Sequence, residues 1–211
     1  MAKVIDGELS GKMGDKIYST YLGRPYVRKR PESVANPRTE AQQAHRTALV
    51  TVARLSSDLK NAHRIGLHHH AQRKKLSTDS DFRKLNLTAC VGTAIAYREV
   101  VVSKGSSVNM VNFTSVVLDE RNVVHVTFES NLTDTNKGDK LCLFVYCPEL
   151  RECQRLKDAF RSDGDVAEQL PERFKDHELH LYGFLQGKNL FTSNTIYSAI
   201  EKKLTFLPQN N

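Results

Sequence analysis

The sequence predicts an α+β protein with a basic N-terminal arm, two helices and a C-terminal antiparallel β-sandwich of the immunoglobulin or fibronectin kind. Three observations lead to this prediction. Glycine and proline interrupt the first 36 residues, an apolar stripe with helical spacing follows, and beyond residue 96 the apolar pattern alternates as it does in strands. We therefore expect an arm over residues 1–36, a helical region over 37–96 and a sandwich over 97–211.

The N-terminal arm is basic and has few apolar residues with which to build a core. Its segments Lys16–Leu22 and Tyr26–Pro31 have the residue types of short strands, but the glycines and prolines around them prevent a long helix. We expect an irregular arm that becomes ordered against another surface or another subunit.

The first helix is predicted to begin near Asn36–Pro37 and to end at Gly66. Asparagine is a good helix cap, proline suits the first helical position, and glycine is a natural stop. Thr39, with Gln42 three residues later, is a second possible cap. Apolar residues recur at helical spacing at Ala41, Ala44, Ala48, Val52, Leu55, Leu59 and Ala62.

A basic, histidine-rich stretch over residues 66–78 is predicted to be a solvated link between the two helices. The second helix is expected to start near Thr78–Ser80. It carries many small residues, which favours close packing against the first helix.

The region after residue 96 is predicted to consist of about seven short strands, as in a β-sandwich. The expected strands are Tyr97–Ser103, Val108–Leu118, Val123–Glu129, Asp139–Cys147, His177–Gln186 and Leu190–Ile200. The second and third of these form a hairpin, as do the last two. Residues 149–161 are compatible with either a helix or a strand.

The four cysteines are expected to be reduced, buried and structural. Cys142 and Cys147 lie five positions apart in one predicted strand, so their side chains should leave opposite faces. The longest apolar run, Leu141–Cys147, is far shorter than the ~18 residues that a membrane span needs. The N-terminus has no apolar segment of a secretory signal. We expect a protein that is not secreted by a signal peptide and has no membrane partner.

Positive charge is concentrated in the first third of the chain. Residues 1–75 contain 15 Lys and Arg and 6 Asp and Glu, a net charge of +9, whereas residues 76–211 have a net charge of −2. A basic stretch of this kind attracts nucleic acid, a membrane surface or an acidic protein face.

The chain shows no motif that carries a reaction. Gly7–Gly14 resembles a phosphate-binding loop, but the spacing of its glycines is wrong and Met13 follows the lysine. There is no G-x-S-x-G nucleophile motif. His63 and His68–His70 lack a carboxylate or a cysteine at a spacing that would complete a metal site. We expect no enzymatic activity, cofactor, metal or small-molecule substrate.

Tyrosines alternate with basic residues in the arm, as they do at protein interfaces and in nucleic-acid clamps. A solvated tail is a third interpretation. The candidate protein-interface residues are Tyr26, Arg28, Arg30, Arg38 and Arg46. For the nucleic-acid alternative, the candidate residues are Lys29, Arg73, Lys74 and Lys75.

The first 46 residues also carry a recognisable motif. It consists of Gly11–Gly14, Gly23, Tyr26–Pro31 and then N-P-x-T-x-x-Q-x-x-x-R over residues 36–46. This pattern resembles the opening of a family of unknown function that is common in Bacteroidetes-type genomes and their phages. Later landmarks also fit that family, namely Val101–Gly105, Tyr182 and Ser193–Tyr197. The chain departs from the pattern in having no tryptophan, which relatives often place in the glycine-rich arm.

The resemblance implies a structural role and supplies no catalytic residues. Similar openings occur in small phage and prophage structural proteins. We therefore expect an assembly protein of a phage-like virion, such as a head–tail connector or a ring component of the tail region. Its partners would be other copies of itself and neighbouring virion proteins. The alternative is a nucleic-acid-binding accessory protein.

Overall fold

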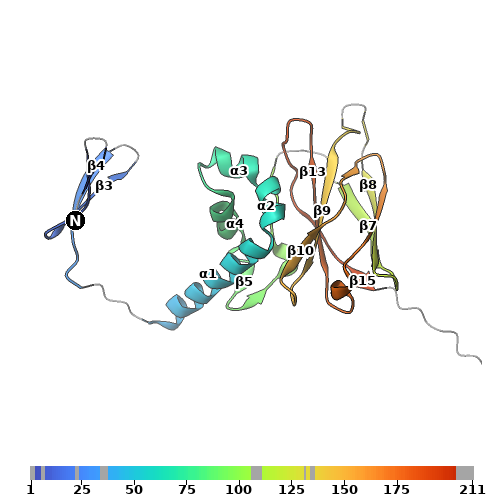
Figure 1. Ribbon diagram of the computed structural model, residues 1–211, viewed down its shortest axis with the longest axis horizontal. Helices are drawn as coiled ribbons and strands as arrows, with labels where there is room; N and C mark the ends of the chain where they lie inside the picture. The colour runs from blue at the N-terminus through green and yellow to red at the C-terminus, as the bar shows by residue number, and fades with distance from the viewer. Residues whose placement is uncertain are drawn as a thin grey trace, which may run out of the picture. The chain divides into compact units, whose positions relative to one another are not determined.

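A computed structural model places the chain in two compact units, residues 1–42 and residues 43–211 (Figure 1). The four α-helices and many antiparallel strands among its described residues confirm the α+β fold class. The residues that the structure describes are 3–5, 8–21, 24–33, 38–105, 111–130, 132–133 and 136–202. No helix in these ranges is both long and apolar enough to cross a membrane.

The first unit contains a four-stranded antiparallel sheet, so the expectation of an irregular arm is wrong. Its strands follow in chain order: β1 (Lys3–Ile5), β2 (Glu8–Met13), β3 (Lys16–Tyr21) and β4 (Arg24–Lys29). The glycine that looked like an interruption forms a turn. Gly14, at a φ of 61°, begins the two-residue connection between β2 and β3, where a positive φ is required.

The second unit begins with a helical layer. Its helices are α1 (Glu40–Asp58), α2 (Lys60–Gly66), α3 (His68–Arg73) and α4 (Thr78–Asn86). The predicted cap at Thr39 is confirmed, because its hydroxyl accepts the N–H of Gln42 at 3.3 Å. Asn36–Pro37 lie outside the described residues. The single helix predicted to run to Gly66 is instead divided into α1 and α2, of which α2 ends at Gly66, whereas the predicted start near Thr78 is confirmed.

The histidine-rich stretch is a helix and not a solvated link. His70 is buried on α3, and its Nδ1 lies 2.5 Å from the carboxylate of Asp81 on α4. His63 is fully buried as well, with Nε2 donating to the carbonyl of Ser56 at 2.9 Å. Both histidines are buried because neighbouring helices pack against them. The pattern of residues within a single segment does not indicate such packing.

Two sheets form the sandwich that the sequence predicts. In the first sheet the order is β10 (Glu152–Arg155), β9 (Lys140–Cys147), β13 (His180–Gln186) and β14 (Ile196–Ala199), and β11 (Ala159–Phe160) also pairs with β9. In the second sheet the order is β12 (Asp165–Gln169), β8 (Val123–Ser130), β7 (Val111–Leu118) and β15 (Glu201–Lys202). Both predicted hairpins are present. The ambiguous residues 149–161 contribute the strands β10 and β11. Residues 106–110 lie outside the described residues.

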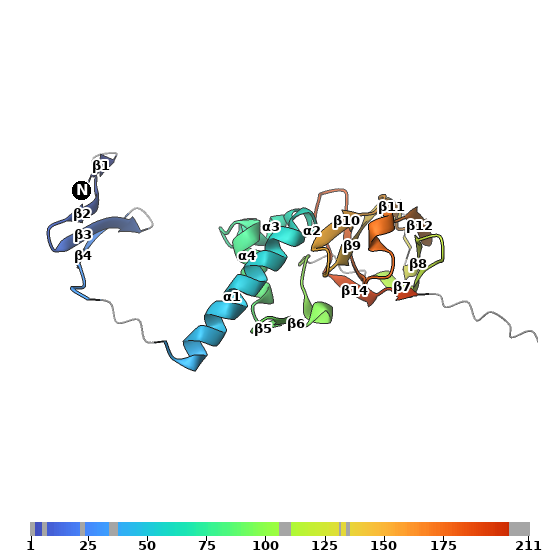
Figure 2. The same ribbon diagram turned by 60° about the horizontal axis from the view of Figure 1, so that its bottom comes forward.

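The first sheet is buried on both faces. From β9, Leu141, Leu143 and Val145 pack against the second sheet. The intervening residues Phe144 and Tyr146 pack against the helices. Figure 2 shows the resulting order of layers: helices, the sheet of β9 and β10, and then the sheet of β7 and β8. Both faces therefore need apolar side chains, which is why Leu141–Cys147 is an uninterrupted apolar run.

The predicted arrangement of the cysteines is confirmed. Cys147 lies in the core between the two sheets, whereas Cys142 lies in the core between sheet and helices. Burial raises the pKa of the Cys142 thiol to about 11, and burial with the nearby Asp58 charge raises that of Cys153 to about 12. All four cysteines are free thiols. Thiols with raised pKa values are poor nucleophiles, as expected of structural cysteines.

The segment Tyr97–Ser103 is not the predicted strand. It consists of a short 3₁₀ helix, η1 (Tyr97–Glu99), and an irregular stretch held by side chains. The backbone N–H groups of Val102 and Ser103 donate to the hydroxyl of Thr195, at 2.9 and 2.8 Å. The hydroxyl of Ser103 donates to the carbonyls of Ser193 and Gly66. Hydrogen bonds between the motif residues Val101–Gly105 and Ser193–Tyr197 thus hold this segment against the region before β14.

Candidate functional site

The sheet of the first unit has no core among its described residues. None of the residues 9–20 and 24–33 has a buried side chain, and all six residues of β4 are exposed. Its exposed apolar side chains include Met13 and Val27, each with 53% of its surface accessible. Both faces of this sheet are therefore available to a partner.

The two faces of this sheet differ in character, because successive residues of a strand point to opposite sides. Arg24, Tyr26 and Arg28 share one face of β4. Ile17 lies across the strand pair from Arg28, and Lys12 lies across from Ile17. This face, which we call the basic face, combines three basic side chains with one tyrosine.

The opposite face is the more apolar one. Val27 and Lys29 point to it from β4, opposite Tyr18 and Lys16 of β3. Met13 of β2 pairs with Lys16 and extends the same face. The nucleic-acid candidate Lys29 and the interface candidates Tyr26 and Arg28 thus lie on different faces.

The remaining predicted site residues are spread over both units. Arg30 follows β4, and its N–H donates to the carbonyl of Asp15 at 2.5 Å. Arg38 precedes α1 in the first unit, whereas the exposed Arg46 lies on α1 in the second unit. Only Tyr26, Arg28 and Arg30 are brought together, in and directly after one strand. Arg73 ends α3, and Lys74 and Lys75 form the exposed turn that follows.

Charge is separated within the second unit. Residues 43–104, which hold the helices, contain 11 Lys and Arg and 4 Asp and Glu, a net charge of +7. Residues 111–202, which hold the sandwich strands, contain 11 and 15, a net charge of −4. The difference in net charge between these two layers, 11 charges, equals the difference between residues 1–75 and 76–211.

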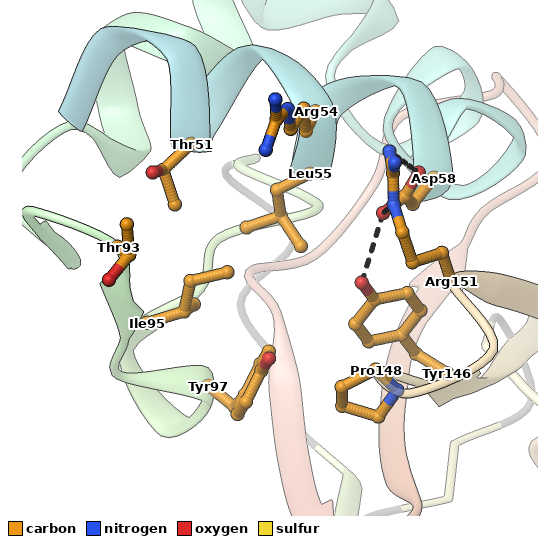
Figure 3. Close-up of a pocket in the computed structure, with 10 residues that line it drawn as sticks. All are labelled: Thr51, Arg54, Leu55, Asp58, Thr93, Ile95, Tyr97, Tyr146, Pro148 and Arg151. Atoms are coloured by element: carbon orange, nitrogen blue, oxygen red, sulfur yellow. Dashed lines mark hydrogen bonds and ion pairs between the residues drawn. The ribbon is translucent and has the colours of Figure 1, made fainter. Parts of the chain in front are cut away.

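A cavity of about 190 Å³ lies between α1, the small hairpin β5 (Cys90–Val91) and β6 (Ala94–Ile95), and the end of β9 (Figure 3). Its polar wall is an ion pair: Arg151 donates through Nε and Nη2 to the two oxygens of Asp58, at 3.2 and 2.8 Å. The hydroxyl of Tyr146 donates to the same carboxylate at 3.1 Å. Burial and the Asp58 charge raise the pKa of Tyr146, so this hydroxyl stays protonated.

None of the residues predicted as site residues lines this cavity, and sequence reasoning missed it. Asp58 and Arg151 are separated by more than ninety positions in the chain. Within its own segment of the sequence, each looks like an ordinary charged surface residue. Only the packing of α1 on the end of β9 brings them together.

The buried His63 leads to a prediction about pH. Burial lowers its pKa, and Arg64 and Lys60 lower it further, although the Ser56 carbonyl and Asp79 act in the opposite direction. An unfolded histidine has a pKa of about 6.5, so the unfolded chain takes up this proton first as the pH falls. Stability should therefore decrease below about pH 6.5, at up to ~1.4 kcal/mol per pH unit for one proton.

His63→Gln should weaken this pH dependence, as measured by urea unfolding between about pH 7.5 and pH 5.5. The matched control is His45→Gln, because His45 is exposed on α1. Equal pH slopes for the wild type and His63→Gln would contradict the assignment.

A search among curated proteins found no significant similarity. The model of a family of unknown function, DUF6266, matches residues 8–199, which include nearly the whole described part of both units. The chain therefore belongs to this family of unknown function, DUF6266.

Proposed function

We propose that the protein is a structural assembly protein whose N-terminal sheet joins it to a second copy of the same chain. The observation that supports this most directly is the absence of any buried side chain among residues 9–20 and 24–33. A small sheet with no covered face is at best marginally stable in water. A partner that covers it would supply the missing core.

Charge complementarity favours a second copy as the partner. The basic face carries Lys12, Arg24 and Arg28, whereas the sandwich region 111–202 has a net charge of −4. The edge strand β12 of the second sheet contributes Asp165 and Glu168 to that negative charge. A contact between two different surfaces of one chain is head-to-tail, and it closes into a ring or continues as a filament.

We further propose that the assembly is part of a phage-like virion, as a head–tail connector or a ring component of the tail region. This part of the proposal is supported by the resemblance of residues 11–46 to phage-associated openings. A location in the virion or in the bacterial cytoplasm belongs to the same proposal.

Light scattering coupled to size-exclusion chromatography tests the proposed contact. The full chain should form an oligomer, and a variant without residues 1–36 should be a folded monomer. Arg28→Glu should shift the oligomer toward monomer, because it reverses a charge on the basic face. Lys29→Glu is the matched control, since it makes the same charge change on the opposite face of the same strand. An unchanged oligomer mass after deletion of residues 1–36 would refute the proposal.

One observation favours nucleic-acid binding as a second candidate function. The helical residues 43–104 carry a net charge of +7, and the exposed Arg73, Lys74 and Lys75 lie together in this region. Electrostatic binding to phosphates weakens steeply as salt rises. Absence of any shift with DNA or RNA at about 50 mM salt would eliminate this candidate.

A further inference from the structure

The cavity between α1 and the end of β9 contains a carboxylate whose charge is already neutralised. Arg151 occupies both oxygens of Asp58, Tyr146 donates a further hydrogen bond, and the Asp58 side chain is only 9% exposed. The acidic group is therefore satisfied by the protein itself. With two arginines and one aspartate in its lining, the cavity has a net charge of +1.

Besides the Thr93 hydroxyl, two hydrogen-bond donors at this cavity have no partner among the described residues. The first is the guanidinium of Arg54, one helical turn before Asp58 on α1, and it forms no ion pair there. The second is the hydroxyl of Tyr97, which points into the cavity (Figure 3). Burial is the main cause of a raised pKa for Tyr97, so its hydroxyl remains a donor at neutral pH. The ring of Tyr97 is fixed by stacking on His180, with centroids 4.2 Å apart.

Thr51 and Thr93 add hydroxyl groups to the lining, and its other residues are apolar. Leu55 of α1 is almost completely buried at the floor, and Ile95 and Pro148 add further apolar surface. With a volume of about 190 Å³, the cavity suits a molecule of a few carbon atoms. An inorganic anion would leave the apolar walls without contacts.

We propose that this cavity binds the carboxylate of a small organic acid with a short apolar body. The carboxylate accepts hydrogen bonds from the Arg54 guanidinium and the Tyr97 hydroxyl, and the body contacts Leu55 and Ile95. Charge-assisted hydrogen bonds to a guanidinium are the strong ones, so Arg54 supplies most of the selectivity for an anion. All of these residues belong to the second unit, and the proposal is independent of the proposed role of the first.

The test is an NMR titration of the full chain with 3-methylbutanoate at low ionic strength. The amide resonances of the β5–β6 hairpin and of η1 should shift and saturate. The corresponding neutral amide, 3-methylbutanamide, should bind at least about tenfold more weakly, because it loses the charge-assisted hydrogen bond. Inorganic phosphate, which has the charge without the apolar body, should also bind more weakly.

Variants connect the binding to the named side chains. Arg54→Gln should weaken binding of 3-methylbutanoate by about tenfold or more, and Tyr97→Phe by about threefold. Arg64→Gln removes an exposed arginine from α2, outside the cavity lining, and should leave the affinity unchanged. Equal binding of acid and amide, an unchanged affinity in Arg54→Gln, or no saturable shift with the acid would each overturn the proposal. Arg54 is exposed, so its replacement should leave the fold and the dispersed spectrum intact.

Discussion

Replacing Phe144 by alanine is expected to lower the free energy of unfolding by about 4 kcal/mol, within the range for large-to-small changes in a core. Phe144 is completely buried in the layer between the helices and the first sheet. Its ring stacks on Phe184 of the neighbouring strand β13, with centroids 5.9 Å apart. The cavity left by alanine would lie beneath the helical layer, where backbone on both sides limits collapse.

Urea unfolding followed by circular dichroism measures this loss. The matched control is Phe160→Ala, because Phe160 pairs with the same strand β9 but is 45% exposed. Phe160→Ala should cost less than about 1 kcal/mol, as is usual for surface changes. Similar losses for the two variants would mean that helices and sheet do not share the core described above.

Gly66→Ala is expected to destabilise the protein by about 2–3 kcal/mol, as overpacking of a filled interior does. A Cβ atom on Gly66 would lie 2.4 Å from the carbonyl oxygen of Val102 and 2.7 Å from the Cβ of Ser103. The first of these is a backbone atom, so a side-chain rotation does not relieve the contact. The carbonyl of Gly66 also accepts hydrogen bonds from Ser103 and from the hydroxyl of Thr192, and a shift of the backbone would disturb both.

Thermal unfolding provides the measurement, with Gly138→Ala as the matched control. A Cβ on Gly138 meets only the far end of the Lys188 side chain, at 3.8 Å. The same chemical change should therefore be nearly neutral there. A Gly66→Ala variant as stable as the wild type would contradict the close approach of the end of α2 to the segment after η1.

Alternating patterns within single strands were predictable from the sequence. In β8, Val124, Val126 and Phe128 point into the sandwich core while His125 is exposed, as their alternation predicts. In the same way, the odd spacing of Cys142 and Cys147 placed their side chains in two different cores. These features depend on neighbours in the chain, and strand geometry imposes them wherever the strand lies.

Features that depend on a distant segment were not predictable in this way. Gly14 looked like an interruption of the arm because its turn becomes visible only when β2 and β3 pair. His70 looked solvated until α4 supplied Asp81 as its partner. Tyr97–Ser103 alternates like a strand, yet hydrogen bonds from its backbone to Thr195 take the place of a neighbouring strand.

The sequence by itself determined the α+β class, the stripe of α1 and the paired strands of the sandwich. Each of these follows from a repeat of two or about 3.6 residues, which any short window of the chain displays. Tertiary structure alone decided the two faces of the N-terminal sheet and the cavity at Asp58. Those features require side chains from separate segments to meet, and no local period records which segments become neighbours.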